Sequence, residues 1–262
     1  MSVQPKKHLG QHFLVDKNIC RKIASQYSSK ETCNRVLEIG PGMGALTEFL
    51  IADELDVWVM EVDRDSIAYL KKEQMLPENQ IIEADFLKAD LANYFGDKPF
   101  SVVGNFPYNI SSQILFRCIE YRNQIPEIMG MFQKEVAQRV AEPPGSKQYG
   151  ILSVLLQAYY DIEYCFTVDE HVFSPPPKVK SGVIRCKRND RGKLPCDEKL
   201  FKQIVKTTFN QRRKTIRNGL KSIVKGYEFD HEYLTLRPEV LSVDQFIELT
   251  IAVEKVISAK PQ

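Results

Sequence analysis

The segment from Arg35 to Leu50 constrains the fold more than any other part of the 262-residue chain. An apolar strand, Arg35–Ile39, leads into glycines at positions 40, 42 and 44, and a helical pattern follows up to Leu50. Glycine lets the turn backbone approach a ligand closely, and the first turn of a helix offers unpaired N–H donors. A strand, a glycine-rich turn and a helix in this order predict a nucleotide-type binding site in a doubly wound sheet.

The glycine spacing only partly matches the dinucleotide fingerprint G-x-G-x-x-G. Ala45 stands at the third glycine position, which tolerates alanine, so spacing alone does not exclude NAD. Pro41, however, removes a backbone N–H from the turn that would hold a pyrophosphate, and no hydride-transfer chemistry is evident elsewhere in the chain. The pattern favours a different nucleotide-like cofactor.

Acidic residues follow the next two predicted strands. Glu61 ends the strand 57–61, about twenty residues beyond the first glycine, where an acid binds ribose hydroxyls in such folds. Asp85 follows the strand 80–83 and is placed to accept from an adenine amino group of the cofactor. Each has an ordinary alternative, a solvated loop carboxylate for Glu61 and a helix cap for Asp85.

Strands and helices alternate along the first two thirds of the chain. Strands are expected at 36–39, 57–61, 80–83 and 100–104, with helical patterns between them, which predicts a parallel sheet covered on both faces. The apolar stretches 128–132, 162–168 and 182–187 complete a seven-stranded sheet with an antiparallel edge. A linker at 187–195 precedes a region with helical patterns only. We expect two domains, a catalytic one at 1–189 and a small all-helical one at 190–262.

The tetrapeptide Asn105-Phe106-Pro107-Tyr108 follows the predicted strand 100–104. Methylation of an exocyclic amino group requires an acceptor for the amino protons and a surface that holds the flat base. Asn105 can accept and Tyr108 can stack, while proline stiffens the turn between them. The alternative is a strand-ending turn with a buried tyrosine.

Phe173 precedes Ser174 and three consecutive prolines, which stiffen the segment and keep it out of a sheet. An aromatic on a rigid loop could stack on the second face of an extruded adenine, opposite Tyr108. The alternative is that Phe173 anchors the loop in the core.

Charge is unevenly distributed along the chain. Residues 178–225 carry ten lysines and six arginines against three acids, a net charge of +13, whereas the whole chain has +2. Such a segment predicts a phosphate-binding surface, with a solvated helix face as the alternative. The densest part is predicted to form a basic helical stripe made of Arg212, Arg213, Lys214, Arg217 and Lys221.

Composition narrows the remaining possibilities. The six cysteines form no C-x-x-C pair and no histidine-spaced set, so no metal site is expected and reduced cytosolic thiols are the default. No apolar run is long enough to cross a membrane, and the N-terminus has no secretory signal pattern. We therefore expect a cytoplasmic protein.

Five motifs in this order closely resemble the ribosomal RNA adenine dimethyltransferases, specifically their small-subunit (KsgA-type) members. The motifs are Gly10–Leu14, Leu37–Gly42, Asn105–Ser111, Phe173–Val179 and Asn210–Thr215. The resemblance extends from about residue 6 to the C-terminus. It implies a class I methyltransferase fold that uses S-adenosylmethionine, and N6-dimethylation of two adjacent adenosines near the 3′ end of 16S rRNA in the 30S particle.

The resemblance also implies roles for individual residues. His12 and Leu14 would contact the cofactor, Gly40 and Glu61 would hold its amino-acid and ribose parts, Asp85 its adenine, and Asn105 the reacting region. Histidine at position 12 and Phe106 depart from the residues common in relatives. The chain is expected to act as a monomer. Two alternatives stay open, a large-subunit (23S) rRNA adenine methyltransferase and a non-catalytic nucleic-acid-binding factor on the same scaffold.

Overall fold

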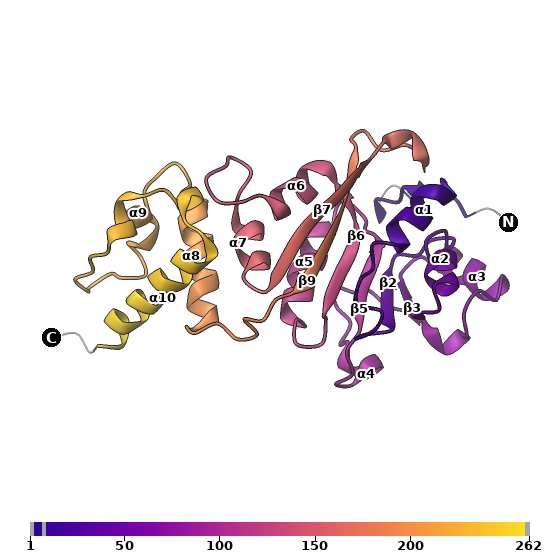
Figure 1. The fold of residues 1–262 in the computed structure, drawn as a ribbon, viewed down its shortest axis with the longest axis horizontal. Coiled ribbons are helices and arrows are strands. Elements are labelled where there is room, and N and C mark those ends of the chain that lie inside the picture. Colours follow the sequence, from indigo (N-terminus) through magenta and orange to yellow (C-terminus); the bar gives the residue numbers. More distant parts are fainter. Residues whose placement is uncertain (1–2, 7–8, 260–262) are drawn as a thin grey trace. The chain divides into compact units, whose positions relative to one another are not determined.

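The computed structural model describes residues 3–6 and 9–259 and divides the chain into two compact units (Figure 1). Residues 1–138 and 161–188 form the sheet unit, and residues 139–160 and 189–262 form the helical unit. This division differs from the expected domains, because the segment 139–160 from the middle of the chain groups with the C-terminal helices. None of the described helices has the length and apolar character needed to cross a membrane.

The sheet unit is built on seven strands in the order β4-β3-β2-β5-β6-β9-β7. From β4 to β6 neighbouring strands are parallel, and β9 is antiparallel to β6. The chain enters the sheet in the middle, at β2, and adds strands outward in both directions. This is the topology of a doubly wound sheet, so the expected α/β fold is confirmed. The strand bounds are β2 Arg35–Ile39, β3 Asp56–Glu61, β4 Ile81–Glu83, β5 Ser101–Asn105, β6 Glu127–Gln133, β7 Tyr160–Val168 and β9 Ser181–Arg188.

Three helices cover one face of the sheet: α1 (Lys17–Ala24), α2 (Thr47–Ala52) and α3 (Arg64–Lys72). Their buried side chains share one apolar cluster with alternate strand residues such as Val57 and Val59. Side chains along a strand point to opposite faces in turn, so each buried strand supplies apolar groups to both layers. This arrangement explains why the strands read as nearly continuous apolar runs.

Helices α4 (Ala92–Phe95) and α5 (Ser111–Glu120) lie on the other face (Figure 1). Phe95 at the end of α4 packs edge-on against Trp58, with ring centroids 5.5 Å apart, and stacks on Phe100 at 4.3 Å. These aromatic contacts attach α4 to the sheet, since its four residues could not form a stable helix alone.

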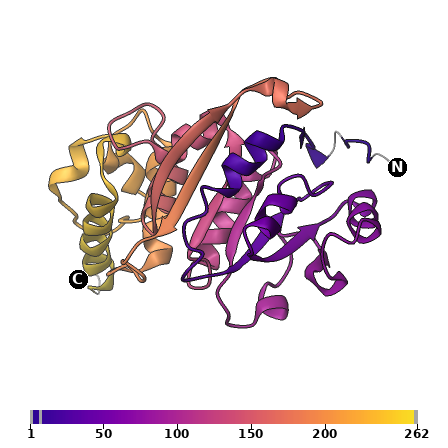
Figure 2. The same ribbon diagram turned by 45° about the vertical axis from the view of Figure 1, so that its right-hand side comes forward.

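A short antiparallel pair joins the beginning of the chain to the proline-rich loop. β1 (Phe13–Leu14) pairs with β8 (Phe173–Ser174), and Figure 2 shows the loop beyond β7 reaching the N-terminal segment. Leu14 is paired with Phe173, and both are buried in the same apolar cluster. The N-terminal segment is therefore an integral part of the sheet unit.

The helical unit packs around aromatic side chains. Phe209 of α8 contacts Tyr149 at 6.1 Å and Phe246 of α10 at 5.9 Å between ring centroids. Asp197 caps α8 by accepting from the Leu200 N–H at 2.8 Å. The helix bounds are α7 Ile151–Gln157, α8 Glu198–Asn210, α9 Ile216–Leu220 and α10 Val243–Ser258. The division between the two units falls within the sequence of α6, Lys134–Ala141.

Candidate active site

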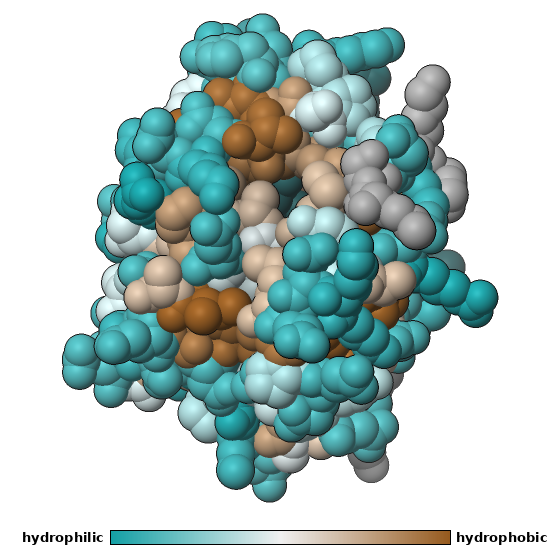
Figure 3. Space-filling view, turned by 90° about the vertical axis from the view of Figure 1, so that its right-hand side faces the viewer, coloured by the Kyte–Doolittle hydropathy of each residue, from teal (hydrophilic) through white to brown (hydrophobic). Residues whose placement is uncertain are grey.

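A cavity of about 240 Å³ lies at the carboxyl ends of β2, β3 and β5 in the sheet unit. Ligands of doubly wound sheets bind at this edge. All the residues expected to touch the cofactor line this cavity, as does Tyr108; they are His12, Leu14, Gly40, Glu61, Asp85 and Asn105. Figure 3 shows the face of the molecule on which α2 and α3 lie, with separate apolar areas and hollows between hydrophilic side chains.

The glycine turn after β2 needs glycine for two reasons. Gly40 and Gly42 have φ values of +65° and +56°, in the left-handed region. A Cβ atom on Gly42 would lie 2.8 Å from Cε1 of Phe13, so any side chain there would have to displace the Phe13 ring. The Gly40 N–H donates to the Met60 carbonyl at 3.0 Å and ties the turn to β3.

Glu61 is fixed at the end of β3 by three backbone donors. Its Oε1 accepts from the N–H groups of Val62 at 2.8 Å and Asp63 at 2.9 Å, and its Oε2 accepts from Gly42 at 3.3 Å. The side chain is buried, and burial raises its pKa. Burial excludes the alternative of a solvated loop carboxylate. The lone pairs that these donors leave can accept from a ligand in the cavity.

Two more acids line the cavity. Glu38 of β2 is buried, accepts from the Thr47 hydroxyl at 2.6 Å, and has its pKa raised by burial to about 7. Asp85 caps its own turn by accepting from the Leu87 N–H at 3.0 Å, and its other oxygen lies 3.3 Å from the Lys88 ammonium. Asp85 is therefore both a turn cap and a residue of the cavity lining.

The chemistry of the lining fits S-adenosylmethionine. Carboxylates and amide oxygens can accept from ribose hydroxyls, from an adenine amino group and from an ammonium group, and they suit a ligand that carries positive charge. Among the described lining residues there is no Lys or Arg, and Pro41 has no N–H to offer. A pyrophosphate would find little to neutralise it, so the cavity does not suit NAD.

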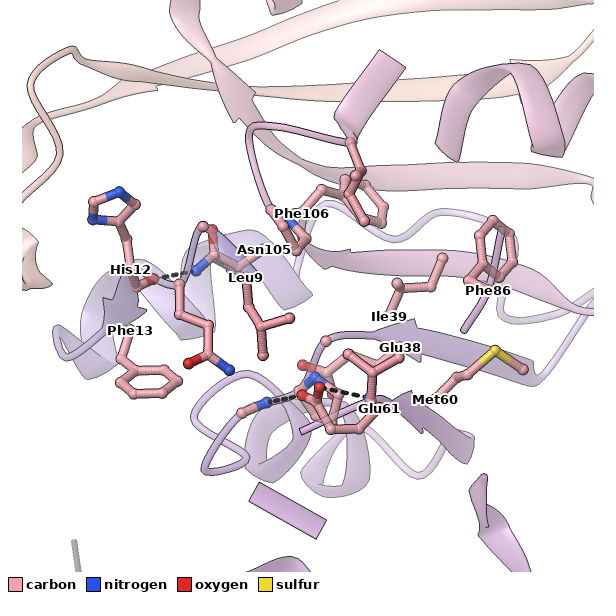
Figure 4. Close-up of a pocket in the computed structure, with 18 of the residues that line it drawn as sticks. Leu9, His12, Phe13, Glu38, Ile39, Met60, Glu61, Phe86, Asn105 and Phe106 are labelled. Atoms are coloured by element: carbon pink, nitrogen blue, oxygen red, sulfur yellow. Dashed lines mark hydrogen bonds between the residues drawn. The ribbon is translucent and has the colours of Figure 1, made fainter. Parts of the chain in front are cut away.

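Asn105 at the end of β5 is oriented by the N-terminal segment (Figure 4). Its Nδ2 donates to the backbone carbonyl of His12 at 2.9 Å. Because a carbonyl can only accept, this bond assigns the amino group to that side and leaves Oδ1 as an acceptor. Asn105 also lines the cavity, so the acceptor that N6 methylation requires is available at the site.

Tyr108 is held in place from two sides. Its hydroxyl lies 2.5 Å from the Oγ atom of Ser181, which is fully buried, and its ring stacks on that of His12 at 5.6 Å between centroids. The His12 ring points away from Glu61 in Figure 4, and its Nδ1 lies 2.9 Å from the Pro175 carbonyl oxygen. His12 therefore joins the N-terminal segment, the Tyr108 turn and the proline-rich loop.

The ring of Phe106 lies in the core as well as on the cavity wall. It is 1% exposed, and its edge atoms would be 2.4 Å from a Cβ atom on Gly130 and 3.1 Å from one on Gly104. Glycines in β5 and β6 thus make the space that a large aromatic needs at position 106. The sequence alone did not connect these three positions.

Phe173 does not project from its loop. It is 3% exposed, belongs to the apolar cluster under α1 and is absent from the described cavity lining. This placement contradicts the expectation of an aromatic that faces the cavity and corresponds to the alternative of a core anchor. The reason is the β1–β8 pairing, which directs Phe173 inward opposite Leu14.

The predicted basic residues of the helical unit do not share one helical stripe. α8 ends at Asn210, and a turn at 211–215 separates it from α9, so the expected continuous stripe is wrong. Gln211 leaves the helical region with φ −112° and ψ 35°. Arg212 and Arg217 have internal partners, since Arg212 donates to the Ser146 carbonyl at 2.9 Å and Arg217 lies 3.5 Å from Asp230.

The other three cations of this region are exposed, and within residues 3–6 and 9–259 no ion pair is seen for them: Arg213, Lys214 and Lys221. They, rather than Arg212, are the side chains free to meet phosphates.

Four residues that hold the site together were not predicted from the sequence. Lys6 and Gln11 contact Asp63, and Ser181 contacts Tyr108. Gln11 lies inside the first motif, but no sequence pattern links it or Lys6 to Asp63. In the described part of the chain, no group of His, Cys, Asp or Glu side chains is arranged to hold a metal ion.

Comparison with known proteins identifies clear relatives. The family model "Ribosomal RNA adenine dimethylase" matches residues 3–257. A protein of Cytophaga hutchinsonii named ribosomal RNA small subunit methyltransferase A is 56% identical over 250 residues, covering 95% of this chain and 96% of its own. A protein of the same name from Bacteroides thetaiotaomicron is 56% identical over 257 residues, covering 97% and 96%.

Solved structures resemble the chain over most of its length. A dimethyladenosine transferase from Plasmodium falciparum superposes with a TM-score of 0.77 at 22% identity, covering 93% of this chain and 98% of the other. The 23S rRNA methyltransferase ErmE gives a TM-score of 0.64 at 25% identity, covering 91% and 99%.

Proposed function

Because the chain belongs to the ribosomal RNA adenine dimethylase family, we propose that it dimethylates N6 of two adjacent adenosines near the 3′ end of 16S rRNA. It is an rRNA methyltransferase of class I that uses S-adenosylmethionine, as the resemblance of its motifs implied. The relatives that are 56% identical carry the small subunit in their names, which supports this target over the large subunit.

The observation that carries the proposal is the orientation of Asn105 beside Tyr108. The Asn105 amino group is bound to the His12 carbonyl, so its Oδ1 is the atom that can accept from the adenine amino group. The Pro107 carbonyl closes the turn by accepting from the Ile110 N–H at 3.2 Å and retains a second lone pair for the same amino group. Two acceptors withdraw the amino protons from the ring plane and localise the N6 lone pair.

S-adenosylmethionine, when bound, supplies a methyl group on a positively charged sulfur. Within the chain, Glu61 and Asp85 would hold its ribose and adenine, and Gly40 would let the backbone approach it. Tyr108 would hold the base by stacking, with its ring fixed by Ser181 and His12. No side chain has to act as a nucleophile or strong base, since the alkylated nitrogen is acidic enough for water to take its proton. Catalysis would come from positioning.

The RNA itself would be bound electrostatically. Arg213, Lys214 and Lys221 are exposed in the helical unit and would contact phosphates, with Arg217 beside them. We propose the 30S particle or its precursor as the substrate, a monomer as the acting form, and the cytoplasm as its location. Phe173, which is buried here, would reach the base only if the proline-rich loop rearranged.

Two alternatives are less well supported. ErmE has the same fold at lower identity, which leaves its 23S target as the enzyme alternative. A non-catalytic binding factor would not require an oriented Asn105 or buried acids around the cavity. This chain has both features.

The test is methyl transfer from labelled S-adenosylmethionine to under-methylated 30S particles and to 50S particles, with Asn105→Ala as the comparison. We expect label only in 30S, at two adjacent adenines near the 3′ end, and a loss of at least 100-fold in Asn105→Ala. Label in 50S would support the alternative of a large-subunit (23S) rRNA adenine methyltransferase. Absence of label in both would support the binding factor.

A further inference from the structure

The N-terminal segment is attached to the loop after β3 by a buried carboxylate. The ammonium group of Lys6 bonds Oδ1 of Asp63, and the Gln11 amide donates to Oδ2 of Asp63 at 3.0 Å. The Lys6 backbone N–H in turn donates to the Gln11 side-chain oxygen at 2.8 Å. These contacts form a small network that joins Lys6 to Asp63, 57 positions later in the sequence.

Asp63 connects this network to the cavity. Its side chain has no exposed surface, while its backbone N–H donates to Oε1 of Glu61 at 2.9 Å. Although burial raises it, hydrogen bonds from Lys6 and Gln11 hold the pKa of Asp63 below its ordinary value. A buried ionised carboxylate of this kind is stable only with its partners in place. Loss of the partners would therefore disturb the loop that presents Glu61.

The segment between the two attachment points forms one wall of the cavity. Leu9, Gly10, Gln11 and His12 all line it. Toward its C-terminal end, the segment is fixed by the bond from Asn105 to the His12 carbonyl and by the β1–β8 pairing. At its other end, the segment contacts the β3 side through the bonds to Asp63 and through the Lys6 ammonium, which lies 2.7 Å from the Asp65 carboxylate.

We propose that Asp63 is a positioning residue that latches the N-terminal segment over the cavity and thereby slows the departure of S-adenosylmethionine. The inference rests on the proposed function only in placing that cofactor in this cavity. The latch acts through Lys6 and Gln11 and does not require Asp63 to touch the cofactor.

A substitution can separate the latch from the structural role of Asp63. Asp63 is also the N-cap of α3, where Oδ1 accepts from the Asp65 N–H at 3.1 Å. Asparagine caps helices about as well as aspartate, so Asp63→Asn retains the cap and removes the charge that binds Lys6. Asp65→Asn is the matched control, because Asp65 also contacts Lys6 but its side chain is 65% exposed and, among the described residues, forms no hydrogen bond with Gln11 or Glu61.

The experiment has two readouts on the full chain. The first is the dissociation constant and dissociation rate of labelled S-adenosylmethionine. We expect Asp63→Asn to weaken binding about tenfold, mainly through a faster dissociation rate, and Asp65→Asn to change it less than threefold. The second is amide hydrogen exchange of residues 9–14 in the cofactor-free protein, which should speed up in Asp63→Asn and stay unchanged in Asp65→Asn.

A double-mutant cycle sharpens the result. If Lys6 and Asp63 act together, Lys6→Met combined with Asp63→Asn should be no worse than Asp63→Asn alone. Unchanged exchange and unchanged cofactor dissociation in Asp63→Asn, or fully additive losses in the cycle, would overturn the latch. A wild-type chain that fails to bind S-adenosylmethionine would instead refute the cofactor site, and the exchange measurement would still decide the latch.

Discussion

The cavity of the sheet unit and the basic turn of the helical unit use charge in opposite ways. Around the cavity the charged groups are acids; Glu38 and Glu61 are buried, and each is fixed by hydrogen bonds. At the turn 211–215 and in α9 the charged groups are cations, and Arg213 and Lys214 are exposed without a described ion pair.

This difference indicates two kinds of recognition. Buried acids have few conformations and shifted pKa values, so they can select the shape and protonation of a small ligand. Exposed cations are screened by salt and mobile, so they suit a polyanion whose phosphates are many and interchangeable. Arg212 is a cation with a structural role, because its guanidinium donates to the Ser146 carbonyl.

Phe173→Ala should have the largest effect, which is a loss of folding stability. Removing a buried phenylalanine from a packed core destabilises by roughly 3–5 kcal/mol, and Phe173 is 3% exposed. Denaturant unfolding would measure this loss of stability. Phe166→Ala is the control and should destabilise less, because Phe166 is only half-buried. A variant that keeps its stability but loses turnover would show instead that Phe173 reaches the base.

Tyr108→Ala should lower RNA methylation without changing cofactor affinity. Base–aromatic stacking contributes roughly 1–3 kcal/mol, so a loss of about 10- to 100-fold in kcat/KM for RNA is expected. Ser181→Ala removes only the partner of the Tyr108 hydroxyl and should cost about tenfold or less. Equal cofactor and RNA defects in Tyr108→Ala would contradict its assignment to the base.

The double variant Arg213→Ala/Lys214→Ala should weaken RNA binding about tenfold and reduce the salt dependence of that binding. Each lost phosphate contact lowers the slope of log K against log salt by roughly 0.7–0.9. Arg212→Ala, the comparison, should lower the melting temperature more than the slope, because its guanidinium bonds the Ser146 carbonyl. If Arg212→Ala changed the slope most, the division between structural and binding cations would be wrong.

Glu38→Gln should flatten the pH dependence of cofactor binding. The free protein has Glu38 protonated below a pKa of about 7, and a cationic ligand favours the carboxylate, so wild-type affinity should rise with pH up to about 7 and then level off. Calorimetry at pH 6 and pH 8 should show up to about a tenfold difference in the wild type. Glu61, whose pKa is also raised, would leave a smaller residual slope. An unchanged profile in Glu38→Gln would rule out Glu38 as its source.

Tyr149→Phe should have the smallest effect and should stabilise the helical unit. The Tyr149 hydroxyl is buried and, among the described residues, has no hydrogen-bond partner. Removing an unsatisfied hydroxyl is expected to raise the unfolding free energy by about 1 kcal/mol. Tyr233→Phe serves as a contrast, since the Tyr233 hydroxyl is bonded to Glu248 at 2.7 Å. A destabilised Tyr149→Phe would indicate a bound water at the hydroxyl.

The sequence predicted what depends on local pattern. Apolar runs located the strands, and strand-end residues such as Gly40, Glu61, Asp85 and Asn105 lie at one cavity because parallel strands end at the same edge. Contacts between distant segments could not be predicted in this way. The link from Lys6 to Asp63, the inward turn of Phe173 and the internal use of Arg212 all depend on tertiary pairing that no local pattern contains.

The pairing of β1 with β8 has a consequence for the order in which the molecule is completed. Residues 13–14 pair with residues 173–174, which are synthesised about 160 residues later. At roughly 5–20 residues per second, the interval is on the order of ten seconds or more. A nascent chain can therefore form β2 to β6 before the β1–β8 pair that fixes one end of the cavity wall exists, so this wall is completed only after about two thirds of the 262 residues have been made.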